Sequence, residues 1–246
     1  MTETVTAHCL DCGAPGDCPA CLQEVYRCQA CGDAAWVARQ AERRAQEARD
    51  LASQRRGRLA LLQDAGLLRE STRHMRLDSL TVDSDNRNAI QAAREWLTGG
   101  GRGLWLHGPP GTGKSFLGRT LLGEHYGENA RLIAEVSAPR FLRVSRDWES
   151  GELALSRLAR VDLLLVDDLD KARWNDSGLA SLWRLCDDRC EGRRRSIVTS
   201  NVPARVLIQR CAGDLLENWT AAVDRLKPLT TVKLDGPSRR DGAFSE

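Results

Sequence analysis

Residues 108–115 have the composition and spacing of a phosphate-binding loop. They read Gly108-Pro109-Pro110-Gly111-Thr112-Gly113-Lys114-Ser115, which matches the pattern G-x-x-x-x-G-K-[ST]. An apolar run precedes them and a helix-like run follows, the context in which this pattern binds triphosphates. The glycines let backbone N–H groups surround the phosphates, Lys114 would reach the β- and γ-phosphates, and the Ser115 hydroxyl would bind Mg²⁺. A chance match in a glycine-rich turn is the alternative.

Two acids follow a buried strand about fifty residues further on. The run Val161–Asp168 is apolar from Leu163 to Val166 and ends in Asp167 and Asp168, which is the form of a Walker B element. The strand would carry both acids to the carboxyl edge of the sheet, where ligands bind in open α/β folds. We expect Asp167 to hold Mg²⁺ through water and Asp168 to orient or deprotonate the attacking water. An ordinary acidic loop after a strand is the alternative.

A polar residue also ends the next apolar strand. Ser196–Thr199 is followed by Ser200 and Asn201. An amide at the tip of a neighbouring strand can hydrogen-bond the γ-phosphate or the attacking water, so Asn201 is a candidate catalytic residue. The alternative is an asparagine that only forms the turn before Pro203.

Paired cysteines near the amino terminus predict a metal site. They form three C-x-x-C pairs: Cys9, Cys12, Cys18, Cys21, Cys28 and Cys31. Fifteen residues separate the first and third pairs, which fits a zinc pattern; the first two pairs form a competing set with a tighter loop. We expect one structural Zn²⁺, or two sharing a ligand, without a catalytic role because four thiolates close the site. A redox pair is the alternative, but it lacks a βαβ context.

Composition fits a soluble globular protein with three segments. The chain has 246 residues, 41% hydrophobic and 28% charged, with a formal net charge of +2. We expect a zinc-binding module at 1–34, a basic helical linker or partner-binding region at 35–76, and an α/β domain at 77–246. The polar start and the lack of a long apolar run predict no secretory signal, no membrane partner and a cytoplasmic location.

The middle segment concentrates positive charge. It carries ten arginines against five acids, at helical spacing among alanines. The pattern predicts a helix to about Ser53 and a second one around Leu59–Ala65. Such a helix could contact DNA phosphates, dock a partner, or simply be solvated.

Beyond Leu77, strand-like and helix-like runs alternate, which predicts a parallel α/β sheet. The expected strands are Gly103–His107, Arg131–Val136, Asp162–Asp167, Ser196–Thr199 and Thr230–Leu234. The expected helices are Asn86–Leu97, Ser115–Tyr126, Ala138–Arg146, Ser177–Cys190, Arg205–Arg210 and Thr220–Leu226.

Several of these motifs together resemble one family. They are GPPGTGKS at 108–115, VDLLLVDDL at 161–169, Asp187-Asp188-Arg189, TSNVP at 199–203, Asp224-Arg225-Leu226 and Gly236-Pro237-Ser238-Arg239-Arg240. Over about residues 65–241 the chain resembles AAA+ ATPases of the DnaC/IstB type, which are replicative helicase loaders and their transposition relatives. The resemblance implies a P-loop AAA+ five-stranded parallel sheet flanked by helices, without a C-terminal lid because only six residues follow Arg240.

The resemblance also implies roles for single residues. Asn201 matches sensor 1, and Arg225 matches an arginine finger that acts on nucleotide bound to a neighbouring subunit; a solvated helix charge is its alternative. Arg240 falls where the family has a sensor-2-like arginine. Arg239 replaces the family's tyrosine, so the choice between these two arginines stays open.

The segment after the second strand is a candidate DNA site, because in replication initiators and loaders an extra helix here lines a channel for single-stranded DNA. Its residues are Arg140, Phe141, Arg143 and Arg146, with the arginines near one helix face. Basic groups beside an aromatic ring suit contacts with the DNA backbone. An ordinary amphipathic helix is the alternative.

The resemblance therefore implies a cytoplasmic ATPase, in a bacterium or a phage-infected host, that loads a hexameric DnaB-type helicase onto single-stranded DNA. It would use ATP, Mg²⁺ and Zn²⁺, assemble into a spiral or ring-like oligomer, and hydrolyse ATP weakly until assembled. Hydrolysis would act as a release switch. The alternatives are an IstB-like transposition helper and a nucleotide-gated DNA-binding adaptor without significant hydrolysis.

Overall fold

The computed structural model describes residues 4–19, 27–127, 131–210 and 214–239. Its chain divides into two compact units, Met1–Gln54 and Arg55–Glu246. In the described ranges, no helix is both long enough and apolar enough to cross a membrane.

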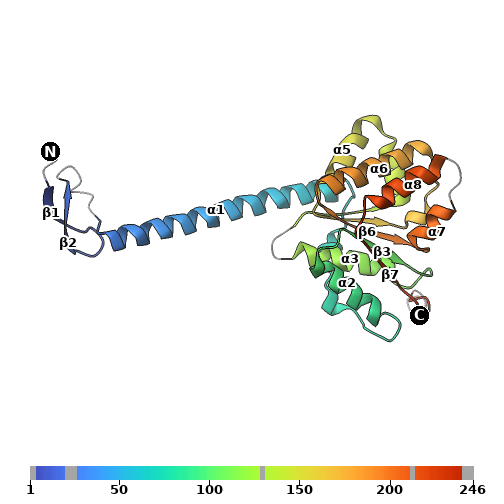
Figure 1. Ribbon diagram of the computed structural model, residues 1–246, viewed down its shortest axis with the longest axis horizontal. Coiled ribbons are helices and arrows are strands. Elements are labelled where there is room, and N and C mark those ends of the chain that lie inside the picture. The colour runs from blue at the N-terminus through green and yellow to red at the C-terminus, as the bar shows by residue number, and fades with distance from the viewer. Residues whose placement is uncertain (1–3, 20–26, 128–130, 211–213, 240–246) are drawn as a thin grey trace. The chain divides into compact units, whose positions relative to one another are not determined.

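The amino-terminal unit contains a small hairpin and most of a long helix (Figure 1). Strands β1 (Thr4–His8) and β2 (Pro15–Pro19) pair antiparallel, with His8 opposite Pro15. Helix α1 runs unbroken from Gln29 to Asp64 and continues into the second unit. The sequence predicted two helices here. One helix forms because Gly57 costs only about 1 kcal/mol within a run of strong helix formers.

Five parallel strands form the sheet of the second unit, in the order β4-β5-β6-β3-β7. Their bounds are β3 (Gly103–His107), β4 (Ile133–Ser137), β5 (Leu163–Asp167), β6 (Arg195–Ser200) and β7 (Leu229–Lys233). The predicted sheet is confirmed. Strands β5, β6 and β3 are adjacent and parallel, so their carboxyl ends lie together at one edge of the sheet, although β3 and β6 are far apart in sequence.

Helices cover both faces of this sheet (Figure 1). Helices α2 (Arg87–Gly99) and α3 (Lys114–Tyr126) lie on one face, and α5 (Trp148–Arg160), α6 (Asp176–Glu191) and α8 (Asp214–Asp224) on the other. The remaining elements are α4 (Ala138–Ser145), α7 (Ala204–Gln209) and the short 3₁₀ helices η2 (Glu70–His74), η3 (Leu77–Ser79) and η4 (Leu169–Lys171). Helix α5 was not predicted, because its Gly151 and single leucines gave a weak helical pattern.

Apolar side chains bury the strands from both sides. Leu104, Trp105 and Leu106 on β3 are fully buried, as are Leu163 and Leu165 on β5. Continuous apolar strands of this kind are typical of parallel sheets covered on both faces. The sheet is therefore a rigid support for the loops at its carboxyl edge.

One arginine lies inside this core. Arg189 on α6 is 2% exposed, and burial lowers its pKa to about 9. Its guanidinium donates to Leu158 O at 2.7 Å and Val161 O at 3.0 Å, and also to Arg195 O. Carbonyl acceptors satisfy the buried donors, which would otherwise cost several kcal/mol. Arg189 thus fastens α6 to the end of α5 and to the start of β6.

The segment before α2 packs on the second unit, which makes a truncation informative. Leu59, Leu62, Leu67 and Leu68 are at most 4% exposed. At roughly 1.5–3 kcal/mol for each buried leucine, their loss approaches the whole stability of a domain, about 5–15 kcal/mol. We expect a chain beginning at Arg55 to keep the urea midpoint of the second unit and a chain beginning at Leu77 to unfold at much lower urea. Equal midpoints would contradict this packing and favour the expected boundary at 77.

Candidate functional site

A cavity of about 490 Å³ lies where β3, β5 and β6 end. Its lining includes most of the phosphate-binding loop, Lys114 and Ser115 among it, together with charged and polar residues from other parts of the chain: Arg119, Asp168, Lys171, Asn201 and Arg239. The lining also includes apolar side chains, namely Leu80, Ile90, Phe116 and Leu234. A lining with both polar and apolar side chains suits a nucleotide, which has a charged phosphate chain and a flat base.

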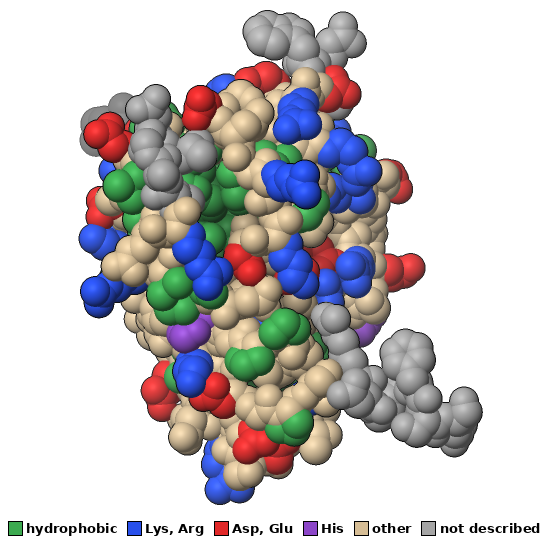
Figure 2. All heavy atoms as spheres, turned by 90° about the vertical axis from the view of Figure 1, so that its right-hand side faces the viewer, with side chains coloured by type: hydrophobic (Ala, Val, Ile, Leu, Met, Phe, Trp, Pro, Cys, Tyr) green, Lys and Arg blue, Asp and Glu red, His purple; other side chains and the backbone are tan. Residues whose placement is uncertain are grey.

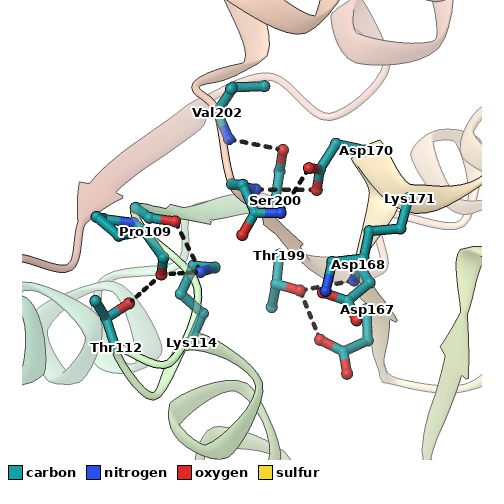
Figure 3. Close-up of polar contacts among 12 residues, drawn as sticks. Pro109, Thr112, Lys114, Asp167, Asp168, Asp170, Lys171, Thr199, Ser200 and Val202 are labelled. Atoms are coloured by element: carbon teal, nitrogen blue, oxygen red, sulfur yellow. Dashed lines mark hydrogen bonds and ion pairs between the residues drawn. The ribbon is translucent and has the colours of Figure 1, made fainter. Parts of the chain in front are cut away.

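The loop 108–113 joins β3 to α3 and places Lys114 at the start of that helix (Figure 3). Lys114 Nζ donates to Gly108 O at 2.8 Å and Pro109 O at 2.7 Å, and Thr112 Oγ1 donates to Pro109 O at 3.0 Å. Gly108 has φ +145°, and a Cβ there would lie 1.9 Å from Leu234 O. Glycine is therefore required where the loop passes β7. The N-terminus of α3 faces the cavity and favours anions.

The two acids at the end of β5 point in different directions: Asp167 is the last residue of the strand, and Asp168 follows it. Asp167 is buried, accepts from Thr199 Oγ1 at 2.5 Å and contacts Arg119 Nη2 at 3.1 Å. Asp168 adopts a left-handed conformation, with φ 56°, and lines the cavity. Aspartate tolerates this conformation better than most residues, and such backbone geometry often occurs at functional sites. The reversal of direction brings the Asp168 carboxylate, and not that of Asp167, to the cavity surface.

Two residues of η4, Asp170 and Lys171, contact polar residues of the cavity (Figure 3). Asp170 accepts from the Asn201 backbone at 2.9 Å and from Asn201 Nδ2 at 2.8 Å. Lys171 Nζ lies 3.6 Å from Asp168 Oδ1. The Asp168–Lys171 pair is partly exposed and contributes little stability, so its carboxylate can exchange partners at low cost.

The chain is similar in sequence to ATP-binding proteins of insertion sequences. Over 118 residues the chain is 34% identical to an insertion-sequence ATP-binding protein of Sinorhizobium fredii, covering 47% of this chain and 39% of that protein. Over 134 residues it is 30% identical to the ATP-binding protein of insertion sequence IS1162 from Pseudomonas fluorescens, covering 53% and 55% respectively. The chain thus spans about half of these relatives or less. No protein-family model matches it.

Solved structures share the fold of the second unit. DnaI superposes with a TM-score of 0.58 at 20% identity, covering 70% of this chain and 94% of DnaI. The DnaC helicase loader gives 0.54 at 19%, covering 67% and 100%. DnaA bound to AMPPCP and single-stranded DNA gives 0.55 at 20%, covering 68% and 52%. The second unit has the P-loop AAA+ fold of these structures, and it is called the AAA+ domain from here on. The resemblance to the loader and insertion-sequence group is confirmed.

Of the two candidate sensor arginines, only one is described. Arg239 lines the cavity of the AAA+ domain, pairs with Asp83 at 2.7 Å and donates from its backbone to Gly111 O at 3.0 Å. Arg240 lies outside the described residues. Arg239 is therefore a candidate for the sensor-2 role beside Arg240.

The candidate arginine finger lies away from its own domain's cavity. Arg225 follows α8 and forms an ion pair with Asp187 on α6. It is not among the lining residues of the cavity in the same chain. A position outside its own site is what an arginine acting on a neighbouring subunit requires, and the role stays a prediction.

The candidate DNA-binding residues on α4 separate into two groups. Phe141 is 1% exposed and packs 6.0 Å from Trp174, and Arg140 Nη2 donates to Ala65 O at 2.6 Å. Phe141 is therefore unavailable for stacking on a base, which corrects the expectation for that residue: the same face of α4 packs on the core. Arg143 and Arg146 are exposed and stay candidates.

The described surface near the carboxyl edge is of mixed charge. Figure 2 shows lysine and arginine side chains interleaved with acids around apolar areas on the side towards which β6 leads in Figure 1. Basic groups are frequent there but do not form one continuous field. Electrostatics alone therefore does not fix a DNA path on this face.

Four cysteines come together in the amino-terminal unit: Cys9, Cys12, Cys28 and Cys31, with all sulfurs within 4.8 Å of one another. The turn between β1 and β2 supplies one pair, and the start of α1 supplies the other. Gly13 takes φ +73° in that turn and donates to Cys9 O at 2.9 Å. Cys18 is buried on β2 outside this group, and Cys21 lies outside the described residues.

The chemistry of this cluster fits a cation. Backbone N–H groups of Cys12 and Cys28 lower the pKa of Cys9 to about 6, which favours a thiolate. Hydrogen bonds among the sulfurs, first with Cys12, raise the pKa of Cys31, so the group cannot ionise fully without a balancing charge. Zn–S bonds of about 2.3 Å give sulfur separations near 3.8 Å, and Cys12 and Cys28 Sγ lie 3.6 Å apart. Between the two sets left open by the sequence, the geometry fits the first and third pairs.

Sequence reasoning missed two cavity residues, Arg119 and Lys171, and one residue that supports the cavity, Asp170. They belong to no motif that we used, although each contacts a motif residue. Arg119 lies four residues after Ser115 on α3, and therefore on the same helix face. That spacing was the available signal.

Proposed function

We propose that the AAA+ domain binds ATP·Mg²⁺ and hydrolyses it. The observation that carries this proposal is the single cavity that holds the phosphate-binding loop, Asp168 and Asn201. Its volume, near 490 Å³, suits a nucleotide. ATP-binding relatives at 34% and 30% identity support the same conclusion.

The residues of the site have different roles in phosphoryl transfer. Lys114 and the loop N–H groups bind the β- and γ-phosphates, and Ser115 and Asp167 would hold Mg²⁺. The metal, when bound, offsets the charge that develops on the phosphate oxygens. Asp168 accepts the proton of the attacking water and Asn201 orients that water. Arg225 of a neighbouring copy stabilises the transition state, so turnover depends on assembly.

We propose that this cycle controls the loading of a DnaB-type hexameric helicase onto single-stranded DNA. In support, the likeness extends over 94% of the solved DnaI chain and 100% of the solved chain of the DnaC helicase loader, and a DnaA structure that shares the fold is bound to AMPPCP and single-stranded DNA. Exposed Arg143 and Arg146 are the residues we assign to the DNA backbone. The cysteine cluster, with one Zn²⁺, and α1 would bind the helicase.

A second candidate has independent support. Both sequence relatives are ATP-binding proteins of insertion sequences. The same ATPase could therefore pass DNA to a transposase. The two candidates share the nucleotide chemistry and differ in the protein partner.

A coprecipitation experiment separates them. Tagged full-length protein, with ATP or ADP, is offered the hexameric helicase and an insertion-sequence transposase from the same source. We expect the helicase to be retained with ATP and released on hydrolysis, and the chain beginning at Arg55 to retain little. Retention of the transposase alone overturns the loader proposal. Helicase retention by the truncated chain overturns the role of the amino-terminal unit.

A further inference from the structure

A partly buried arginine joins two acids on neighbouring strands of the AAA+ domain. Arg119 Nε donates to Glu135 Oε2 at 2.7 Å, and Arg119 Nη2 donates to Asp167 Oδ2 at 3.1 Å. The three side chains are 18%, 8% and 10% exposed respectively. Charge-assisted bonds at this depth are stronger than surface ion pairs because water screens them little.

The fold explains why one arginine reaches both acids. Ser137 on β4 lies opposite Asp167 on β5, so Glu135, two residues earlier, points to the same face of the sheet. Helix α3 packs against both strands. Arg119 lies one turn after Ser115 on that helix and also lines the nucleotide cavity. The contact is therefore part of the floor beneath the candidate Mg²⁺ site.

Glu135 has a second set of partners at its other oxygen. Oε1 accepts from Arg69 N at 3.0 Å and from Thr72 Oγ1 at 3.2 Å, and Glu135 N donates to Leu67 O at 2.7 Å. Thr72 is fully buried. These donors belong to the segment 67–72, which follows α1 in the chain. One buried carboxylate thus connects that segment to Arg119.

We propose that Arg119 and Glu135 form a relay that couples Mg·ATP at Asp167 to the segment 67–72. Arg119 is the positioning residue: it holds the Asp167 carboxylate and shares its charge between Asp167 and Glu135. The inference rests on the proposed nucleotide function and deepens it. It gives the connection between the nucleotide and the chain that leads to the amino-terminal unit.

Competition between two cations drives the relay. The Arg119 guanidinium contacts Asp167. Mg²⁺ held by Asp167 would place a second positive charge beside it, and like charges near one carboxylate repel. Metal binding would shift Arg119 towards Glu135. This shift would change the strength of the hydrogen bonds that Glu135 accepts from Arg69 and Thr72. Coupling of this kind is reciprocal, so a partner that displaces the segment 67–72 also alters the affinity for Mg·ATP.

Binding measurements with a fluorescent ATP analogue test the first link. For full-length wild type, Glu135→Gln and Thr120→Val, the dissociation constant is measured in EDTA and in Mg²⁺. In Glu135→Gln the whole guanidinium charge faces Asp167, so we expect the gain in affinity from Mg²⁺ to fall by about fivefold or more, the lower end of usual coupling. Binding in EDTA should not change. Thr120 on α3 is buried like Glu135, and among the described residues its hydroxyl donates to Phe116 O, so its variant is the matched control.

Hydrogen exchange tests the far end of the relay. We expect Mg·AMPPCP to change the exchange of amides 67–75 in wild type and Thr120→Val, and to change it much less in Glu135→Gln and Thr72→Val. Thr72→Val removes one hydroxyl at constant shape, so it keeps the test valid if Glu135→Gln folds poorly. An unchanged Mg²⁺ gain in Glu135→Gln, or an equal exchange response in Thr72→Val, overturns the relay. Wild type that binds no analogue in either buffer overturns the proposed function itself.

Discussion

Replacement of Asp168 by asparagine should lower ATP turnover by about 10²–10⁴-fold, the usual contribution of a positioned general base. Mg·ATP binding should persist, because Lys114, Ser115 and Asp167 remain. The reason is geometric: of the two acids at the end of β5, Asp168 lines the cavity and Asp167 does not. An amide keeps the shape of the side chain but accepts no proton from the attacking water.

The measurement is phosphate release by the assembled protein, with helicase and single-stranded DNA present, alongside fluorescent nucleotide binding. Asp176→Asn, an exposed acid in the first turn of α6, serves as the matched control and should behave as wild type. If Asp168→Asn turned over ATP at the wild-type rate while Lys114→Ala did not, another group would be activating the water.

Loss of the metal should unfold the hairpin of the amino-terminal unit. Among its described residues before α1, only Ala7, Cys9 and Cys18 are buried, and an isolated two-stranded hairpin is marginal in water. Structural zinc contributes apparent binding free energies of about 10–16 kcal/mol in small zinc domains. We therefore expect Cys28→Ser to abolish zinc retention and to expose the amides of residues 4–19 to rapid exchange.

Zinc content per chain and hydrogen exchange measure this effect. Cys18→Ser is the discriminating control, because Cys18 lies outside the cluster and should leave zinc bound. Nucleotide binding and the unfolding of the AAA+ domain should be the same in both variants. Zinc loss in Cys18→Ser with retention in Cys28→Ser would instead identify the competing set of cysteines as the ligands.

Sequence patterns predicted the AAA+ sheet well, because its strands are continuous apolar runs that end in recognisable motifs. The motifs Gly108–Ser115 and Val161–Asp168 can be recognised from the spacing of residues within one short segment. The different positions of the Asp167 and Asp168 carboxylates could not be predicted in this way. They depend on the left-handed backbone at Asp168 and on the contact of Asp167 with Arg119, 48 residues away.

The sequence also failed to predict contacts between side chains of different elements. Phe141 has the right neighbours for a DNA site, but its ring packs on Trp174 because the apolar face of α4 turns to the core. Asn201, assigned from the end of β6, lines the cavity, and only its hydrogen-bond partner Asp170 on η4 was missed. Sequence spacing predicts which side chains share an element. It does not predict which side chains meet across elements.

The tight packing around the phosphate-binding loop has a thermodynamic consequence. Leu234 N donates to His107 O at 2.7 Å, Arg239 N donates to Gly111 O at 3.0 Å, and Ser238 lies against Gly111. Folding itself therefore restrains the loop, before any phosphate arrives. Less conformational entropy remains to be lost on binding, so more of the interaction energy is expressed as affinity. Preorganisation of this kind favours a nucleotide that binds firmly and leaves slowly, and hydrolysis then becomes the step that sets how long each bound state lasts.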